Sequence, residues 1–194
     1  MNRIAVIDFE TTGLSPTQGA RATEVAAVIL SDGQIIGRYQ SLMNSGGYIP
    51  AEITRLTGIT NKMVASAPPA KQVIRELHDF VQDSVLVAHN ASFDRKFLIN
   101  EGLLAGLSFK DNFLCTLLLS RRLFPTAVNH KLGTLANHVG LRVEGSFHRA
   151  LFDAEITAQL FVKLVDKIKT RRSIDQVTFD FLYKLQKSKI QRNY

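Results

Sequence analysis

The hydrophobic positions along the chain follow two periods, which predicts strands interleaved with helices. Strand patterns occupy five stretches, namely residues 3–10, 22–30, 34–43, 85–88 and 112–115. The turn residues Ser31-Asp32-Gly33 predict that the second and third strands form a hairpin. The first strand is apolar on both faces, which is typical of a central strand covered on both sides.

Helical periodicity fills most of the remaining chain. Helices are predicted over residues 51–57, 60–65, a stretch after Pro68-Pro69 that includes 73–81, 91–101, 116–124, 131–138, 149–169 and 173–187. A hairpin followed by alternating strands and helices predicts an α/β fold with a central, mixed five-stranded sheet and helices on both faces.

The chain length predicts one main domain. Its 194 residues can bury a substantial core. The pattern breaks near Arg171-Arg172, so we expect a domain over residues 1–170 and a basic C-terminal helix or tail over residues 171–194. The apolar side of that last helix could serve a homodimer.

Composition excludes several classes of protein. A single cysteine, Cys115, rules out an internal disulfide and any zinc site built on several thiolates. The apolar runs are far shorter than the roughly 20 residues of a membrane helix. The N-terminal residues lack the apolar stretch of a secretory signal. We therefore expect a soluble, cytoplasmic protein with no membrane partner.

The positive charge is concentrated at the C-terminal end. The chain carries a net charge of +7, and residues 163–194 hold nine of its 24 Lys and Arg but only three of its 17 Asp and Glu. This asymmetry is typical of a protein that binds a polyanion. A solvated helix that keeps the protein soluble would show the same pattern.

Several acidic residues lie near the ends of predicted strands and helices, on the faces that point into the protein. Asp8 and Glu10 are two residues apart, so they leave the same face of the first strand. Asp94 lies in the first turn of the helix after the strand at 85–88, where open α/β sheets place their sites. Taken alone, each signal has an ordinary explanation, because a strand can end in water and a first-turn acid favours the helix dipole.

Asp153 completes the set of inward-facing acids. It shares a helical side with Leu160 and Leu164, while His148 is expected on the loop before that helix. Four converging carboxylates without thiolates suit two Mg²⁺ or Mn²⁺ ions. Two such ions about 4 Å apart can bind both sides of a scissile phosphate. His148 could accept a proton from water at neutral pH.

Three segments together resemble the exonuclease motifs of the DEDDh family, which includes the proofreading epsilon subunit of bacterial DNA polymerase III. They are Asp8-Phe9-Glu10-Thr11-Thr12-Gly13, His89-Asn90-Ala91-Ser92-Phe93-Asp94 and the pair His148 and Asp153. The similarity spans about residues 3–168 in the family's order. It implies an RNase H-like fold and metal-dependent removal of nucleotides from a 3′ end.

The resemblance also implies a role for each matched residue. Asp8, Glu10 and Asp153 would hold the first metal ion, and Asp8 would also touch the second. Asp94 would act on the metal ions through water. His148 matches the general base, and its four-residue gap before the last acid distinguishes this branch from relatives with a tyrosine there.

Further segments match the family's nucleotide-binding surface. Thr11, Thr12, Gly13 and Leu14 would lie beside the terminal nucleotide, and Thr57-Gly58-Ile59 resembles a loop that grips the 3′ end. The same residues also fit ordinary turn and helix-start chemistry. His89 and Asn90 are expected to shape the site. Phe93 is expected to meet a base or to pack in the core.

The expected substrate is nucleic acid with a free 3′ end, with single-stranded DNA favoured by the resemblance. The alternative is RNA exonuclease activity with the same acids. The acids do not distinguish the two substrates, because discrimination between the sugars depends on the shape around the 2′-hydroxyl. A non-catalytic nucleic-acid-binding module would tolerate a damaged acid set, which this sequence does not have. The residues after Ile168 read as a basic helix, not a Gly/Gln-rich linker, so polymerase association is not expected.

Overall fold

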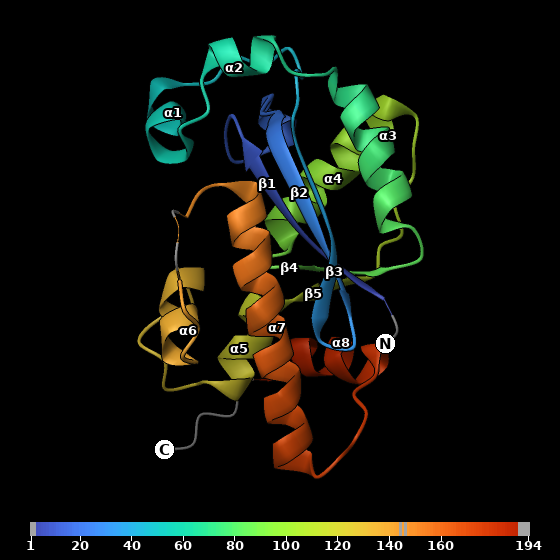
Figure 1. Ribbon diagram of the computed structural model, residues 1–194, viewed down its shortest axis with the longest axis vertical. Helices are drawn as coiled ribbons and strands as arrows, with labels where there is room; N and C mark the ends of the chain where they lie inside the picture. Colours follow the sequence, from blue (N-terminus) through green and yellow to red (C-terminus); the bar gives the residue numbers. More distant parts are fainter. Residues whose placement is uncertain (1–2, 144, 146, 190–194) are drawn as a thin grey trace.

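A five-stranded mixed sheet forms the centre of the protein (Figure 1). The computed structural model describes residues 3–143, 145 and 147–189. The strands are β1 (Ile4–Thr11), β2 (Ala22–Ser31), β3 (Gln34–Leu42), β4 (Val85–Ala88) and β5 (Phe113–Cys115), in the spatial order β3-β2-β1-β4-β5. β2 pairs antiparallel with both β1 and β3, whereas β4 pairs parallel with β1 and β5 pairs parallel with β4.

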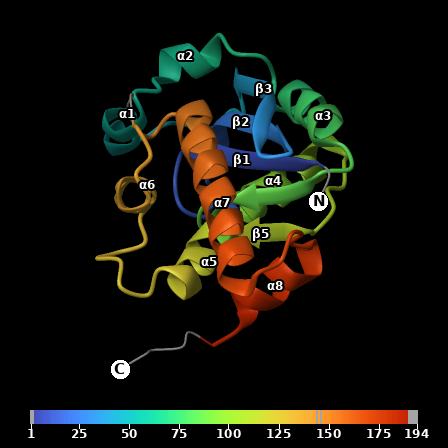
Figure 2. The ribbon, with the colours of Figure 1, turned by 60° about the horizontal axis from the view of Figure 1, so that its bottom comes forward.

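Helices cover both faces of this sheet. They are η1 (Pro16–Gln18), α1 (Ala51–Thr57), α2 (Asn61–Ala65), α3 (Ala70–Val81), α4 (Ser92–Ala105), α5 (Thr116–Leu123), α6 (Leu132–His138), α7 (Ala150–Arg172) and α8 (Phe179–Lys187). α7 lies along one face, with α5, α6 and α8 gathered around it (Figure 2). α3 and α4 pack on the other face. The predicted mixed sheet with helices on both faces is confirmed.

The alternation of side chains along β1 explains the two layers. Ile4 and Val6 belong to the apolar cluster on the α7 side, whereas Ala5, Ile7 and Phe9 belong to the cluster with α3 and α4. A strand buried on both faces is expected to carry apolar side chains on both sides, as Ile4 to Ile7 do. Any polar side chain on it therefore stands out as a functional candidate.

The C-terminal part of the chain differs from its prediction. α8 begins at Phe179 instead of residue 173, because Thr178 caps it by accepting a hydrogen bond from the Phe181 backbone N at 3.2 Å. α7 in turn continues to Arg172, with the following Ser173 at φ 52°. The expected boundary between residues 170 and 171 thus falls inside α7.

Helix α8 adds to the core of the domain. Leu182 is fully buried in the cluster that contains α7, and Val177 is nearly so. The side chain of Gln186 accepts a hydrogen bond from the Cys115 N at 2.8 Å and donates one to the Phe113 O at 3.1 Å. It therefore occupies backbone groups on the outer edge of β5. Apolar residues of α8 thus pack within the chain, and the homodimer suggested above stays a prediction.

The helix boundaries elsewhere agree with the sequence pattern to within a few residues. α4 runs to Ala105 instead of residue 101 and ends at Gly106, whose φ of 76° suits a left-handed helix cap. The short η1 turn was not predicted. Among the described residues, no helix is both long enough and apolar enough to cross a membrane.

Candidate active site

The C-terminal half of β1 carries two acids on the side of α7. Asp8 and Glu10 continue the row begun by Ile4 and Val6, which pack against α7. The parallel pairing of β1 with β4 ends at Val6, so these acids lie beyond the point where β4 protects β1. Glu10 is buried and Asp8 is half-buried.

Asp94 reaches the same place from α4. It is only 2% exposed, and its Oδ1 accepts a hydrogen bond from the Phe9 backbone N at 3.1 Å. Phe9 lies between the two acids of β1, at a level where β4 no longer pairs with that strand. The Asp94 carboxylate thus takes the place of a strand carbonyl and becomes the third acid at this edge.

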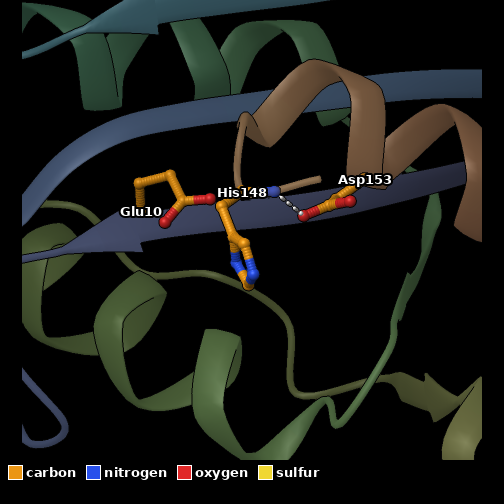
Figure 3. Close-up of side chains that lie close together, drawn as sticks. All are labelled: Glu10, His148 and Asp153. Atoms are coloured by element: carbon orange, nitrogen blue, oxygen red, sulfur yellow. Dashed lines mark hydrogen bonds between the residues drawn. The ribbon is translucent and has the colours of Figure 1, made fainter. Parts of the chain in front are cut away.

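His148 and Asp153 come together at the start of α7. Asp153 Oδ2 accepts a hydrogen bond from the His148 backbone N at 2.9 Å, while its Oδ1 is buried with no hydrogen-bond partner among the described residues. Figure 3 shows both residues beside Glu10. One ligand atom from each of these three residues lies within 4.8 Å of the other two.

A pocket of about 240 Å³ gathers these side chains. All five catalytic candidates and most of the predicted substrate-binding residues line it, namely Asp8, Glu10, Thr11, Gly13, Leu14, Thr57, His89, Asn90, Phe93, Asp94, His148 and Asp153. Segments far apart in the sequence therefore converge on one concave surface, as an active site requires.

Three predicted substrate-binding residues lie outside the pocket lining. Thr12 Oγ1 accepts a hydrogen bond from the Arg21 backbone N at 3.0 Å, which closes the turn after β1. Gly58 ends α1 in a left-handed conformation. Ile59 is fully buried in a small cluster with Ile49 and Val64. Substrate contact by Thr12, Gly58 and Ile59 stays a prediction.

Three other residues line the pocket without having been predicted. Phe9 comes from β1, and Ile53 and Leu56 come from α1. Leu56 is 52% exposed and Leu14, on the β1 side, is 80% exposed. The position of Leu56 directly before the predicted Thr57 was the signal that the sequence offered for this residue. These apolar groups give the pocket a surface for flat, uncharged parts of a ligand.

Burial raises the pKa of all four acids, and repulsion by neighbouring acids adds to it for Asp8, Glu10 and Asp94. Burial is the largest cause in each case, and it raises the pKa of Glu10 and of Asp94 to about 8. The pKa of Asp8 is raised well above its usual range by burial and then by Asp94, Asp153 and Glu10. Burial also raises the pKa of Asp153, although the hydrogen bond from the His148 backbone N–H acts in the opposite direction and lowers it. Such a cluster favours a compensating cation.

His89 connects the pocket to the loop before α6. Its Nε2 lies 2.9 Å from the His130 carbonyl O, which can only accept, so Nε2 carries the proton. Nδ1 then accepts from the Thr116 hydroxyl at 2.8 Å. Burial is the main cause that lowers the His89 pKa to about 4. His89 is thus a neutral side chain that ties the end of β4 to α5 and to the loop before α6, and its expected role in shaping the site stays a prediction.

A family model described as Exonuclease (RNase_T) matches residues 5–161. That range is most of the chain and contains all four acids and His148. The chain belongs to the RNase_T exonuclease family. The resemblance to exonucleases noted in the sequence is thereby confirmed.

Several curated proteins are similar to this chain over most of its length. A DNA polymerase III subunit epsilon-like protein of Rhodobacter capsulatus is 41% identical over 169 residues, which are 86% of this chain and 24% of that protein. The 3′-5′ exonuclease DinG of Bacillus subtilis is 39% identical over 168 residues, covering 86% of this chain and 18% of DinG. The chain therefore spans less than a quarter of the length of these relatives.

Solved structures of RNase_T-like exonucleases have the same fold. Exonuclease X in complex with 5′ overhanging duplex DNA has a TM-score of 0.73 and 27% identity, over 94% of this chain and 99% of that one. The nuclease domain of 3′hExo, a DEDDh family member bound to rAMP, has a TM-score of 0.74 and 21% identity, over 85% and 92%. These likenesses confirm the predicted RNase H-like fold.

The donor set of this RNase_T domain fits a hard divalent cation. Asp153 Oδ1 is buried and lacks a hydrogen-bond partner among the described residues, although buried carboxylate oxygens are normally satisfied. Glu10, His148 and Asp153 already lie within ligand reach of one another. Carboxylate oxygens are the ligands that Mg²⁺ and Mn²⁺ prefer, so a cation here would satisfy both the free oxygen and the excess negative charge.

Proposed function

We propose that the protein removes nucleotides from the 3′ ends of DNA, hydrolysing phosphodiester bonds to nucleoside monophosphates with two Mg²⁺ or Mn²⁺ ions. The observation that carries the proposal is the convergence of four acids of raised pKa and His148 in one pocket. Asp8, Glu10 and Asp153 would hold one ion. Asp8 would also touch the second ion, and Asp94 would act through water.

The protein's own groups have separate tasks in this reaction. When bound, the ions supply charge that activates water and stabilises the leaving oxygen. His148 lies on the exposed loop at the pocket, where its imidazole would take a proton from the attacking water. The Thr11 hydroxyl donates to the Gly13 O at 2.7 Å and so fixes the turn that presents Leu14.

The apolar side of the pocket would hold the terminal nucleotide. Leu14, Leu56 and Phe93 line the same pocket as the acids and His148. Lys96 lies next to this surface, with its Nζ 3.5 Å from the Leu14 O and 5.8 Å from the Phe93 ring centre. A cation at this position suits the phosphate of the adjoining nucleotide.

DNA is the favoured substrate because names and titles among the relatives above 25% identity refer to DNA or to DNA enzymes. Exonuclease X was solved with duplex DNA, and the two relatives of about 40% identity are named as a DNA polymerase III subunit epsilon-like protein and as the 3′-5′ exonuclease DinG. The 3′-exonuclease that recognises histone mRNA is 21% identical, so its likeness concerns the fold alone. RNA is the alternative substrate of the same site. A cytoplasmic location stays a prediction.

One comparison of substrates tests the proposal. Single-stranded DNA, duplex DNA and RNA of one sequence, each labelled at the 5′ end, are incubated with Mg²⁺ or Mn²⁺ and with EDTA. We expect a ladder that shortens from the 3′ end on DNA and is abolished by EDTA and by Asp153→Asn. A ladder on RNA alone would reassign the substrate, and no cleavage of any strand would refute the function.

A further inference from the structure

A second buried glutamate, Glu24, lies beside Glu10, but its carboxylate is hydrogen-bonded by groups of the protein. Glu24 of β2 is the cross-strand partner of Glu10 of β1, so both side chains leave the same face of the sheet. Glu24 is only 1% exposed. Two neighbouring carboxylates repel one another, and burial increases the repulsion. Something must therefore compensate the charge of Glu24.

Four hydrogen bonds use both oxygens of Glu24. Its Oε1 accepts from Gln40 Nε2 at 2.8 Å and from Arg149 Nη2 at 3.0 Å. Its Oε2 accepts from Arg149 Nε at 3.3 Å and from the Ala150 backbone N at 3.1 Å. Asp153, in contrast, keeps one oxygen without a partner. Glu24 is saturated by protein donors and has no free oxygen for an ion.

Three of the four hydrogen bonds of Glu24 come from the start of α7, the segment that carries His148 and Asp153. Arg149 is the N-cap of α7 and makes no side-chain cap of its own, so Glu24 caps the helix from the neighbouring strand through Ala150. On either side of Arg149, His148 N donates to Asp153 and Asp153 N donates to the Arg149 O at 3.1 Å. His148 itself has φ 69°, a conformation that a histidine rarely adopts unless its surroundings hold it there.

We infer that Glu24 is a positioning residue for the nuclease site: through Arg149 and Ala150 it fixes the start of α7, so that Asp153 and His148 face Glu10. The inference rests on the proposed function for its catalytic consequence, but its effect on metal binding stands apart from any substrate. Arg149 also lies close enough to Glu10 to lower its pKa against the effect of burial. Of the two adjacent glutamates, Glu24 would therefore hold the start of α7 through Arg149, while Glu10 stays available for a metal ion.

The protein contains a matched control for this arrangement. Glu101 of α4 is also 1% exposed, and it accepts hydrogen bonds from Arg21 Nε at 2.8 Å, from Arg21 Nη2 at 2.9 Å and from the Ala22 backbone N at 3.2 Å. It is the same clamp of a buried glutamate, a bidentate arginine and a neighbouring backbone N–H. It joins α4 to the start of β2, and among the described residues none of these bonds reaches the start of α7.

The test compares Glu24→Gln with Glu101→Gln in the full chain. Glutamine keeps the shape and one acceptor oxygen but removes the charge, so each variant loses a comparable part of its clamp. The measurements are the Mn²⁺ dissociation constant by electron paramagnetic resonance, kcat and KM on single-stranded DNA, and the thermal midpoint. For Glu24→Gln we expect Mn²⁺ affinity and kcat each to fall by about tenfold or more, since loss of an outer partner typically costs that much.

The control separates positioning from general stability. Glu101→Gln should lower the thermal midpoint while Mn²⁺ affinity and kcat stay within about twofold of the unchanged protein. Arg149→Gln should reproduce the effect of Glu24→Gln, and the double variant should be no worse than either single variant, because both remove one unit. KM should change little in each.

Each outcome decides between the alternatives. Unchanged Mn²⁺ affinity and kcat in folded Glu24→Gln, or equal losses in Glu24→Gln and Glu101→Gln, would overturn the inference. If Glu24→Gln does not fold, Arg149→Gln, whose side chain is half-exposed, gives the same comparison. If the unchanged protein binds Mn²⁺ but cleaves no nucleic acid, the proposed function fails, and Mn²⁺ affinity still tests the clamp.

Discussion

The backbone N–H of His148 donates to Asp153 Oδ2 across 2.9 Å, and this bond joins the proposed base to a proposed metal ligand. It fixes one carboxylate oxygen, while the other stays buried without a partner among the described residues. A side chain with one oxygen held and one free is preorganised for an ion, because little rotational freedom remains to be lost on binding.

Asp153→Asn should abolish turnover without unfolding the protein. The amide keeps an oxygen that can accept from His148 N, but it places an N–H₂ donor and no charge where the free oxygen was. We expect kcat to fall by more than about a hundredfold, since even outer partners of metal ions contribute up to that factor. The measurement is the rate of 3′ shortening with Mn²⁺. Asp166→Asn, on an exposed position of α7, is the control, and full activity of Asp153→Asn would end the metal assignment.

Stability in EDTA should fall as the pH rises. The pKa values of Glu10 and Asp94 are raised to about 8 in the fold, against about 4 in the unfolded chain. The folded state thus holds protons that the unfolded state has released, so the free energy of unfolding decreases with pH until it passes about 8. Between about pH 6 and pH 8 we expect a loss of more than about 1 kcal/mol, measured by urea denaturation.

Mn²⁺ should reverse that trend. A cation bound only by the folded state stabilises it, and it binds more tightly when the acids are ionised. The gain in the free energy of unfolding on adding Mn²⁺ is therefore larger at pH 8 than at pH 6. Equal gains at both pH values would show that the ion does not bind at these acids, and Asp94→Asn should flatten both curves.

His148→Asn should reduce turnover and leave metal binding intact. Asparagine tolerates the positive φ of 69° that this position requires, so the loop is kept while the imidazole is lost. A general base contributes about 10²- to 10⁴-fold, and we expect kcat to fall by that factor with little change in KM. His148→Ala should show the same kinetics with a lower thermal midpoint. If His148→Asn loses its stabilisation by Mn²⁺, the imidazole is a metal ligand and not the base.

Leu182→Ala tests whether the C-terminal segment folds with the rest. Leu182 of α8 is fully buried, so its truncation should lower the free energy of unfolding by about 2–5 kcal/mol. Leu103→Ala, at a position that is 75% exposed, should have almost no effect. Both values come from urea denaturation monitored by circular dichroism. A negligible change for Leu182→Ala would favour the independent basic tail expected over residues 171–194.

The periodic parts of the fold could be predicted because they depend on local pattern. The strand that holds Asp8 and Glu10 and the helix that holds Asp153 both follow from apolar spacing, and so do their buried faces. The start of α8 could not be placed in this way. Its apolar stripe extends back to Ile174, and only the cap at Thr178 sets the first turn.

The partners of the site residues could not be predicted because they depend on register. The bond from Phe9 N to Asp94 joins residues 85 positions apart and exists because β4 ends early. Glu24 was overlooked, although a glutamate inside the otherwise apolar run of β2 requires a buried partner. That partner, Arg149, is 125 positions away.

Leu14 and Leu56 should contribute to substrate binding and little to stability. Both line the pocket and are 80% and 52% exposed, so their truncation leaves no large cavity in the core. Contact with a base is worth about 1–3 kcal/mol for a stacking side chain, and an apolar leucine should lie at the lower end of that range. We therefore expect Leu14→Ala and Leu56→Ala each to raise KM for single-stranded DNA by about fivefold. Their thermal midpoints should be unchanged, and Val128→Ala, at an exposed position outside the pocket lining, is the control. An unchanged KM in the double variant Leu14→Ala/Leu56→Ala would mean that the apolar wall does not meet the nucleotide, and binding would then rest on the phosphate contacts alone.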